Sequence, residues 1–378
     1  MAKKKRQVRA NFRKNRTTPA RDRIRADGLD PQDARLDDAR TSQSVRGKGD
    51  LTRRRTVAGA EVQEDAAGSQ TVLLEIDRSR CQLGRVLRVQ GLNSTVQFED
   101  GSTRRCATRR LLKTLATDQR HVVAAGDWAW VRPEGADEGI IERIEPRRGV
   151  LSRTSRGRQH VLVANVDQLL IIVSAAEPRL TPHLVDRYLV TAEKSGAEAV
   201  ICINKIDLVD PAALQPLVGV YSQLGYRVLL LSAAKGWNIE ALRSLTLGRG
   251  SVVAGQSGVG KSSLLNAIQP GLALRVKTVS AENQKGRHTT TTSELIPLEG
   301  GGYLVDTPGI RQFQLWDVIP AEVAGYFRDL RPFVSQCRYP DCTHAHEEPC
   351  AVKDAVADGY IDVRRYESYL QMLIDDSP

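Results

Sequence analysis

Gly255-Gln256-Ser257-Gly258-Val259-Gly260-Lys261-Ser262 stands between the apolar run 252–254 and a helix-forming run that starts at Ser263. The pattern G-x-x-x-x-G-K-[S/T] in this setting predicts a phosphate-binding loop. Its glycines let backbone amides face the phosphates, Lys261 can reach the β- and γ-phosphates, and the Ser262 hydroxyl can ligate Mg²⁺. The alternative is a glycine-rich turn that contains Lys-Ser by chance, and the flanking strand and helix disfavour it.

Around this loop, short apolar runs alternate with amphipathic segments. Such alternation predicts a parallel β-sheet with helices on both faces. The predicted strands are 167–173, 199–203, 228–231, 252–254 and 303–305, and the predicted helices are 182–195, 211–224, 238–245 and 261–268. Beyond residue 312 the strands stop, and helices, the last near 363–374, are predicted around a cysteine-rich loop.

Two further motifs concern the base of the nucleotide. Asn204-Lys205-Ile206-Asp207 follows the predicted strand 199–203 and has the N-K-x-D form found in Ras-like GTPases. The Asp207 carboxylate can accept hydrogen bonds from guanine N1–H and N2–H₂, whereas adenine would leave this acceptor unpaired and be strongly disfavoured. Ser232-Ala233-Ala234 follows the next strand and adds the small-residue loop that packs over guanine in such enzymes. These motifs predict guanine rather than adenine recognition and disfavour an ATPase.

The remaining motifs concern Mg²⁺ and the γ-phosphate. Asp306-Thr307-Pro308-Gly309 has the D-x-x-G form, in which Asp306 would hold Mg²⁺ through water and the Gly309 amide would contact the γ-phosphate. Four threonines follow His288, and Thr290 and Thr291 are the candidates for a switch ligand to Mg²⁺. The same threonines also suit the start of a strand that ends near Pro297.

The motifs occur in an unusual order. Ras-like GTPases run from the phosphate-binding loop through the switch threonine and D-x-x-G to N-K-x-D and S-A, whereas here the last two come first. This order predicts a circularly permuted GTPase domain, whose loops still meet at the carboxyl edge of one sheet. The residues predicted to contact the nucleotide and its Mg²⁺ are Asn204, Lys205, Ile206, Asp207, Ser232, Ala233, Gly255, Gln256, Ser257, Gly258, Val259, Gly260, Lys261, Ser262, Ser263, Thr290, Thr291, Asp306 and Gly309.

A separate cluster predicts a structural metal site. Cys337, Cys342, His344 and Cys350 have the spacing C-x₄-C-x-H-x₅-C, and three thiolates with one imidazole form the set of a closed Zn²⁺ site. His346 is an alternative to His344. Four protein ligands leave no open position for water, which disfavours a catalytic zinc. The remaining alternative is a group of free cysteines in a helix-rich tail.

The first 150 residues divide into two parts. Residues 1–70 are rich in charge without a sustained period, and no secondary structure is predicted there. From residue 71, short β-type runs separated by turn residues predict a small β-barrel, for which a five-stranded OB-type barrel fits the length. The predicted strands are 71–76, 85–89, 94–98, 128–131 and 140–144.

Charge and hydropathy exclude other classes of protein. The net charge of +10 lies almost wholly in residues 1–23, where ten Lys and Arg residues and one acid give +9 and leave about +1 for the rest of the chain. No apolar run approaches the ~20 residues that span a bilayer, and no apolar segment follows the basic start, so we expect neither a membrane protein nor a secreted one. Cysteines beside histidines also agree with a reducing cytoplasm.

The whole arrangement resembles the ribosome small-subunit-dependent GTPase A (RsgA) family. The barrel, the permuted motifs and C-x₄-C-x-H-x₅-C carry the resemblance over roughly residues 71–375. It implies four regions: a basic extension (1–70), an OB-type barrel (71–150), a permuted GTPase domain (151–312) and a helical zinc-binding domain (313–378). It further implies binding to the 30S subunit and its 16S rRNA during late maturation, subunit-stimulated hydrolysis of GTP to GDP, and release afterwards. A monomer is expected.

His288 is the candidate catalytic residue beside Lys261. Directly after D-x-x-G, where many signalling GTPases carry a water-orienting glutamine, this chain has Ile310, whose alkyl side chain cannot orient water. His288 is the available polar group in the switch, and the family is similarly thought to use the histidine of its G-x-H-T-T-T stretch. The alternative is an exposed loop histidine without a catalytic role.

For the whole chain, the alternative function is that of an RNA-binding scaffold or chaperone in which GTP acts only as a switch.

Overall fold

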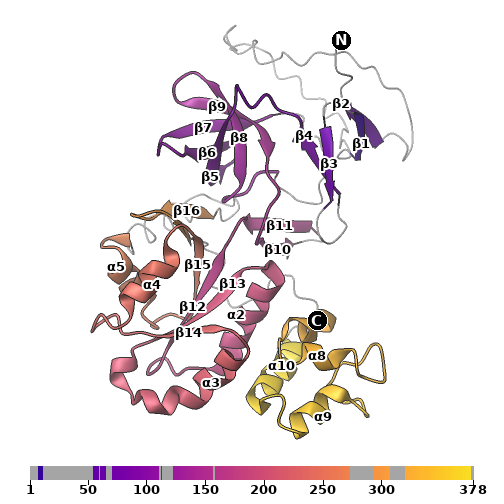
Figure 1. Cartoon of the computed structure of the whole chain (residues 1–378), viewed down its shortest axis with the longest axis vertical. Helices are drawn as coiled ribbons and strands as arrows, with labels where there is room; N and C mark the ends of the chain where they lie inside the picture. The colour runs from indigo at the N-terminus through magenta and orange to yellow at the C-terminus, as the bar shows by residue number, and fades with distance from the viewer. Residues whose placement is uncertain are drawn as a thin grey trace, which may run out of the picture. The chain divides into compact units, whose positions relative to one another are not determined.

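A computed structural model describes residues 7–11, 54–58, 60–64, 70–109, 112, 122–155, 158–272, 293–306 and 320–375 of the chain. The chain forms two compact units, one from residues 1–75 with 110–117 and the other from residues 76–109 with 118–378. The second unit contains a β-barrel, a helix-covered sheet and a group of C-terminal helices (Figure 1).

The barrel is closed by five strands. They are β5 (Gln82–Gln90), β6 (Asn93–Phe98), β7 (Thr103–Thr108), β8 (Trp128–Glu134) and β9 (Glu138–Ile144). The order β5-β6-β7-β9-β8 returns to β5, and β7 and β9 are the parallel pair. Alternate side chains fill the interior, among them the fully buried Val86, Val96 and Ile141. This confirms the predicted OB-type barrel.

One strand prediction for the barrel was wrong, and one barrel strand was not predicted. The run 71–76 does not belong to the barrel, because β4 (Gln70–Leu74) pairs with β3 (Ala60–Glu64) in the smaller unit. The missing barrel strand is β7, which the sequence analysis did not predict. In its sequence TRRCAT, half-buried Arg104 shares a face with buried Cys106, so a charged residue stands where a hydrophobic alternation would have an apolar one.

The central sheet has the order β14-β13-β12-β15-β17-β16. All neighbours are parallel except β16 and β17. The strands are β12 (Gln168–Ser174), β13 (Glu198–Asn204), β14 (Arg227–Leu230), β15 (Gly250–Ala254), β16 (Glu294–Pro297) and β17 (Tyr303–Asp306). The strand that leads into Gly255 thus lies inside the sheet, beside β12 and β17, as the permuted order of motifs requires.

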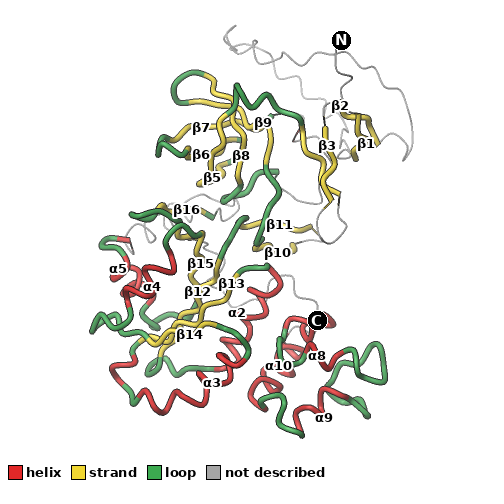
Figure 2. The backbone as a smooth tube through the Cα atoms, viewed as in Figure 1, coloured by secondary structure: helices red, strands yellow, loops and turns green. Residues whose placement is uncertain are grey.

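Helices cover both faces of this sheet (Figure 2). They are α2 (Pro182–Ser195), α3 (Gln215–Gln223), α4 (Ile239–Thr246) and α5 (Lys261–Ile268). β12 is buried along its whole length and alternates between two cores: Ile171 packs with α2 and α3, whereas Ile172 packs with α4 and α5. This double burial explains why the strand is a continuous apolar run. The predicted helices 182–195 and 261–268 match α2 and α5 to the residue.

The C-terminal residues form a third hydrophobic core. Its helices are α7 (Val323–Tyr326), α8 (Arg331–Val334), α9 (Ala351–Ala357) and α10 (Val363–Asp375). Phe327, Tyr369 and Met372 are buried in it, and Val190 of α2 joins them. The aromatic rings of Phe327 and Tyr369 meet edge to face, with centroids 5.8 Å apart. A helical C-terminal domain was predicted and is confirmed.

Within the smaller unit, two antiparallel strand pairs are described. β1 (Gln7–Asn11) pairs with β2 (Arg54–Ala58), and β3 pairs with β4. The prediction of no secondary structure across residues 1–70 is therefore wrong for β1, β2 and β3. Each strand has only five residues, which is too short for a period-2 pattern to be recognised in the sequence.

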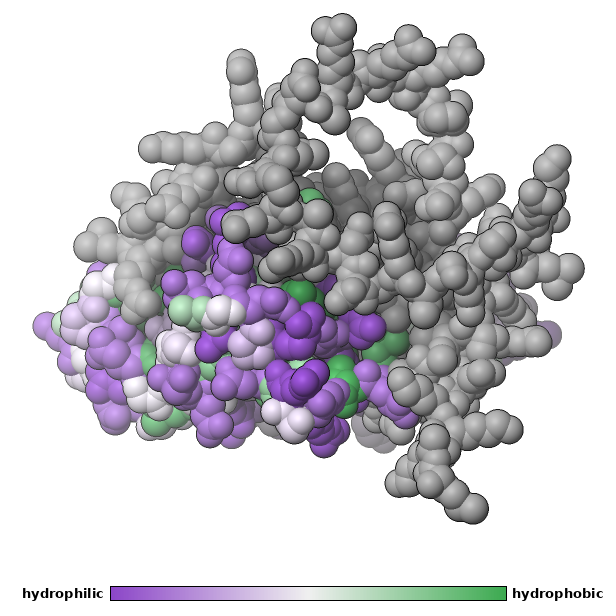
Figure 3. Space-filling model, turned by 90° about the horizontal axis from the view of Figure 1, so that it is seen from above, coloured by the Kyte–Doolittle hydropathy of each residue, from purple (hydrophilic) through white to green (hydrophobic). Residues whose placement is uncertain are grey.

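On the face drawn in Figure 3, hydrophilic side chains predominate over the described part of the surface, and apolar ones are scattered. Scattered apolar residues are ordinary on a protein surface. Among the helices that the structure describes, none combines the length and apolar character needed to cross a bilayer.

Candidate nucleotide and metal sites

The predicted phosphate-binding loop joins β15 to the N-terminus of α5. Gly258 and Gly260 have φ values of 85° and 94°, a region that side chains other than hydrogen rarely permit. A Cβ at Gly260 would also collide with the Asn204 side chain. The Lys261 ammonium curls back over the loop and donates to the carbonyl oxygens of Gly255, at 2.8 Å, and Gln256. The loop therefore has the curvature and the cation that a phosphate group requires.

Asn204 connects this loop to both base-recognition motifs. Its Nδ2 donates to the Val259 carbonyl at 2.9 Å, and its Oδ1 accepts from the Ala233 amide at 3.1 Å. The Asn204 side chain is buried, and one amide group thereby ties together the N-K-x-D, S-A and phosphate-binding loops. Three segments that are separated in the sequence meet at one edge of the sheet, as predicted.

The Asp207 carboxylate is oriented by its neighbour in the S-A loop. The hydroxyl of fully buried Ser232 donates to Asp207 Oδ1 at 2.6 Å, and Ser232 Oγ accepts from the Lys235 amide at 3.0 Å. A carboxylate held in one orientation is suited to a two-point contact with a planar base. Ile206 is buried in the core beneath, which anchors the motif to the sheet.

One further segment at this edge could not be recognised in the sequence. Residues 175–178 follow β12, and the Glu177 carbonyl accepts a hydrogen bond from Lys205 Nζ at 2.5 Å. No motif marks this loop, because its contribution comes from a backbone carbonyl. Only the position of β12 in the interior of a parallel sheet, with its carboxyl end at the ligand-binding edge, could have suggested it.

Several predicted site residues lie outside the described part of the chain. These are His288, Thr290, Thr291 and Gly309. Asp306 is the last residue of β17, the strand beside β15, so its backbone ends at the same sheet edge as the phosphate-binding loop. Their predicted roles stay predictions.

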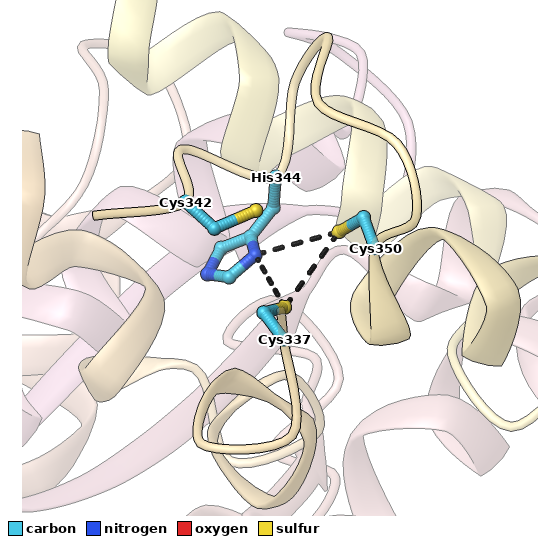
Figure 4. Close-up of side chains that lie close together, drawn as sticks. All are labelled: Cys337, Cys342, His344 and Cys350. Carbon is cyan, nitrogen blue, oxygen red and sulfur yellow. Dashed lines mark hydrogen bonds between the residues drawn. The ribbon is translucent and has the colours of Figure 1, made fainter. Parts of the chain in front are cut away.

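The four predicted metal ligands converge in the C-terminal region (Figure 4). The ligand atoms of Cys337, Cys342, His344 and Cys350 lie within 4.8 Å of one another. Cys337 Sγ lies 3.8 Å from Cys350 Sγ, and His344 Nδ1 lies 3.3 Å and 3.5 Å from these sulfurs. Tetrahedral Zn²⁺ with Zn–S bonds of about 2.3 Å would separate its sulfur ligands by roughly 3.8 Å. The residues therefore fit a structural zinc ion.

Local structure selects His344 rather than His346. The His344 side chain is buried, and its backbone is in the left-handed conformation (φ 57°). The His344 carbonyl oxygen accepts a hydrogen bond from the Tyr366 hydroxyl at 2.7 Å. The Tyr369 hydroxyl holds the preceding carbonyl of Thr343 at 2.6 Å. The side chain of His346 is 82% exposed and lies 3.6 Å from Glu347. Two tyrosines of α10 thus fix the loop that carries the ligand.

Protonation in this cluster is linked to cation binding, because the thiols must lose their protons to ligate a metal. Burial lowers the pKa of His344, which keeps its imidazole neutral and able to ligate. Burial and the neighbouring thiols Cys350 and Cys337 raise the pKa of Cys342 to about 12, although its backbone contact with His344 acts in the opposite direction. The thiolate form of such a cluster therefore requires a positive ion to balance it.

A buried ionic group joins the C-terminal core to α2. The guanidinium of Arg365, which is 2% exposed, pairs with Asp186 of α2 at 2.5 Å and with both oxygens of Asp329 at 2.9 and 3.0 Å. The Tyr221 hydroxyl of α3 also donates to Asp186, at 2.9 Å. The sequence analysis did not predict this group, because its three charged members are 179 residues apart at the widest.

The sheet order and the loops at its edge define a circularly permuted P-loop GTPase. A family model described as RsgA GTPase matches residues 144–316. The chain belongs to the RsgA GTPase family, because relatives that it covers almost completely are more than one third identical to it. The family resemblance drawn from the motifs is thereby confirmed.

Curated relatives illustrate the extent of this similarity. The small ribosomal subunit biogenesis GTPase RsgA of Chlorobaculum parvum is 39% identical over 302 residues, which span 77% of this chain and 96% of the relative. The protein of the same name from Moorella thermoacetica is 44% identical over 257 residues, spanning 68% of this chain and 86% of the relative.

Two solved structures share the fold. The crystal structure of YjeQ from Thermotoga maritima has a TM-score of 0.64 at 35% identity and covers 78% of this chain and 98% of its own. The crystal structure of YloQ, a circularly permuted GTPase, has a TM-score of 0.61 at 27% identity, with coverage of 79% and 96%.

Proposed function

We propose that this protein is a GTPase of small ribosomal subunit biogenesis. It binds the 30S subunit, assists late maturation, and hydrolyses GTP to GDP and phosphate in a subunit-stimulated reaction that releases it. The observation that carries the proposal is Asn204, whose amide joins the loops for phosphate and guanine into one site. The relatives named small ribosomal subunit biogenesis GTPase support the cellular role.

Within this proposal, each loop has a role toward the nucleotide. The amides of the phosphate-binding loop and Lys261 bind the β- and γ-phosphates, and Asp207 accepts from the guanine edge. Ser262, Asp306 and a switch threonine would hold Mg²⁺, which neutralises charge that develops on the phosphates. His288 orients the attacking water, since Ile310 cannot. The zinc ion is structural and stabilises the C-terminal domain.

The test of this proposal is GTP turnover with and without purified small subunits, with large subunits as the control. We expect small subunits to raise phosphate release at least ~10-fold, and large subunits to have no effect. His288→Ala should retain GTP binding and lose this stimulation, because positioned proton-transfer groups contribute about 10²–10⁴-fold. Normal turnover of the variant on the subunit would contradict the role of His288. Binding without any stimulated turnover would instead favour the scaffold alternative.

The basic extension belongs to the same proposal as a contact to 16S rRNA. Ten Lys and Arg residues within residues 1–23 can neutralise phosphates, which makes binding depend on salt. Deleting residues 1–25 should weaken subunit binding roughly tenfold at low salt and flatten its dependence on salt concentration. A variant in which residues 1–6 and 12–25 are scrambled and β1 is kept should bind like the intact chain. Unchanged affinity and salt dependence after deletion would exclude the extension from binding.

We further propose that the protein acts in the cytoplasm as a monomer.

A further inference from the structure

The loop that follows β12 is closed by a buried hydroxyl. Ser174 is the last residue of β12 and is 1% exposed. Its Oγ accepts from the Ala176 amide at 3.2 Å and donates to the Glu177 carbonyl oxygen at 2.9 Å. The backbone of the loop is also tied to the neighbouring strand, because the Ala175 amide donates to the Asn204 carbonyl at 2.8 Å. One side chain therefore fixes where the Glu177 carbonyl points.

The same carbonyl holds the lysine of the N-K-x-D motif. Lys205 Nζ donates to Glu177 O at 2.5 Å, and Lys205, directly after the end of β13, has a left-handed backbone (φ 65°). Its Cε lies close to the phosphate-binding loop, 4.0 Å from the position that a Cβ on Gly260 would take. Pro178 of the loop similarly lies 3.6 Å from the corresponding position on Gly258. Residues 174–178 thus contact both the base-recognition and the phosphate-binding segments.

We propose that Ser174 is a positioning residue for guanine-nucleotide binding. It sets the Glu177 carbonyl that holds the Lys205 ammonium, so that the lysine stem lies beside the phosphate-binding loop. This inference rests on the proposed function of the site as a nucleotide site. A lysine has a long, flexible side chain, and holding its end in advance lowers the entropy that must be lost when the nucleotide binds.

A double-mutant cycle with GDP tests this chain of contacts. Ser174→Ala removes the hydroxyl, and Lys205→Met keeps the apolar stem but removes the ammonium. We expect Ser174→Ala to weaken GDP binding about fivefold, the effect of one lost hydrogen bond, chiefly through faster dissociation. In the Lys205→Met background the same substitution should have no further effect, since both act through the Glu177 carbonyl.

The matched control is Ser195→Ala, at the C-terminal end of α2. Ser195 Oγ makes a similar pair of local hydrogen bonds, to the Ala192 carbonyl at 2.9 Å and from the Ala197 amide at 3.4 Å, but lies away from the nucleotide edge. Thermal unfolding of each variant separates lost affinity from lost stability. The inference is overturned if Ser174→Ala binds GDP normally, if its effect adds to that of Lys205→Met, or if Ser195→Ala weakens GDP equally. Absence of GDP binding by the unmodified chain would instead refute the proposed function.

Discussion

His344→Ala is expected to remove zinc from the protein and to unfold the loop that carries the ligands. A structural zinc ion supplies folding free energy directly, about 10–16 kcal/mol in small zinc-binding peptides. Metal analysis of the purified chain should give one equivalent of Zn²⁺ before the substitution and a large loss after it. Hydrogen exchange should accelerate in residues 337–350 and in α10, whose Tyr366 and Tyr369 bond to the ligand loop.

His346→Ala provides the matched control, because this histidine is two residues away and exposed. It should retain one equivalent of zinc and normal exchange. Zinc retained by His344→Ala and lost from His346→Ala would reverse the assignment of the ligand. Absence of zinc from the freshly purified chain would refute the metal site altogether.

Asp207→Asn is expected to weaken GTP binding by about 100-fold or more. The carboxylate would accept from two guanine donors, and hydrogen bonds to charged groups contribute about 1.5–3 kcal/mol each. The asparagine amide would place its own NH₂ donor against a guanine donor, so discrimination between GTP and ATP should fall as well. Binding titrations with the two nucleotides measure both effects.

Asp210→Asn is the control for this substitution. Asp210 lies three residues further on, is exposed, and accepts from the Ala212 amide at the start of a short helical turn. Its replacement should leave the affinity for both nucleotides unchanged. Equal losses from both variants would show that the effect of Asp207→Asn is structural rather than directed at guanine.

The sheet could be predicted almost completely from sequence. β12 and its neighbours are buried on both faces, so hydrophobicity alone marks them, and α2 begins and ends with clear signals. Thr181 precedes Pro182 at the start of α2, and Gly196 ends the helix in the left-handed conformation. The permutation followed from the order of motifs, because loops at one edge of a parallel sheet must converge whichever connection comes first.

Other elements could not be predicted from a single sequence. β7 carries a half-buried arginine, Arg104, where an apolar residue would mark a strand. The pairing of β3 with β4 depends on two five-residue segments that are too short to specify each other. In the nucleotide site, side chains with diagnostic chemistry such as Asn204 were predictable, whereas the Glu177 carbonyl was not, since every residue has one. The choice of His344 over His346 likewise depended on burial, which spacing does not reveal.

The buried group formed by Arg365, Asp186 and Asp329 restricts how this sequence can vary. Replacing the arginine alone would leave two carboxylates in apolar surroundings, a loss of about 3–5 kcal/mol, whereas exchanging a buried ionic group as a whole for apolar residues is often neutral. Substitutions at these three positions should therefore occur together during evolution. Among relatives, a change at one of them would be accompanied by changes at the other two, even though they lie on helix α2, on α10 and in the turn before α8.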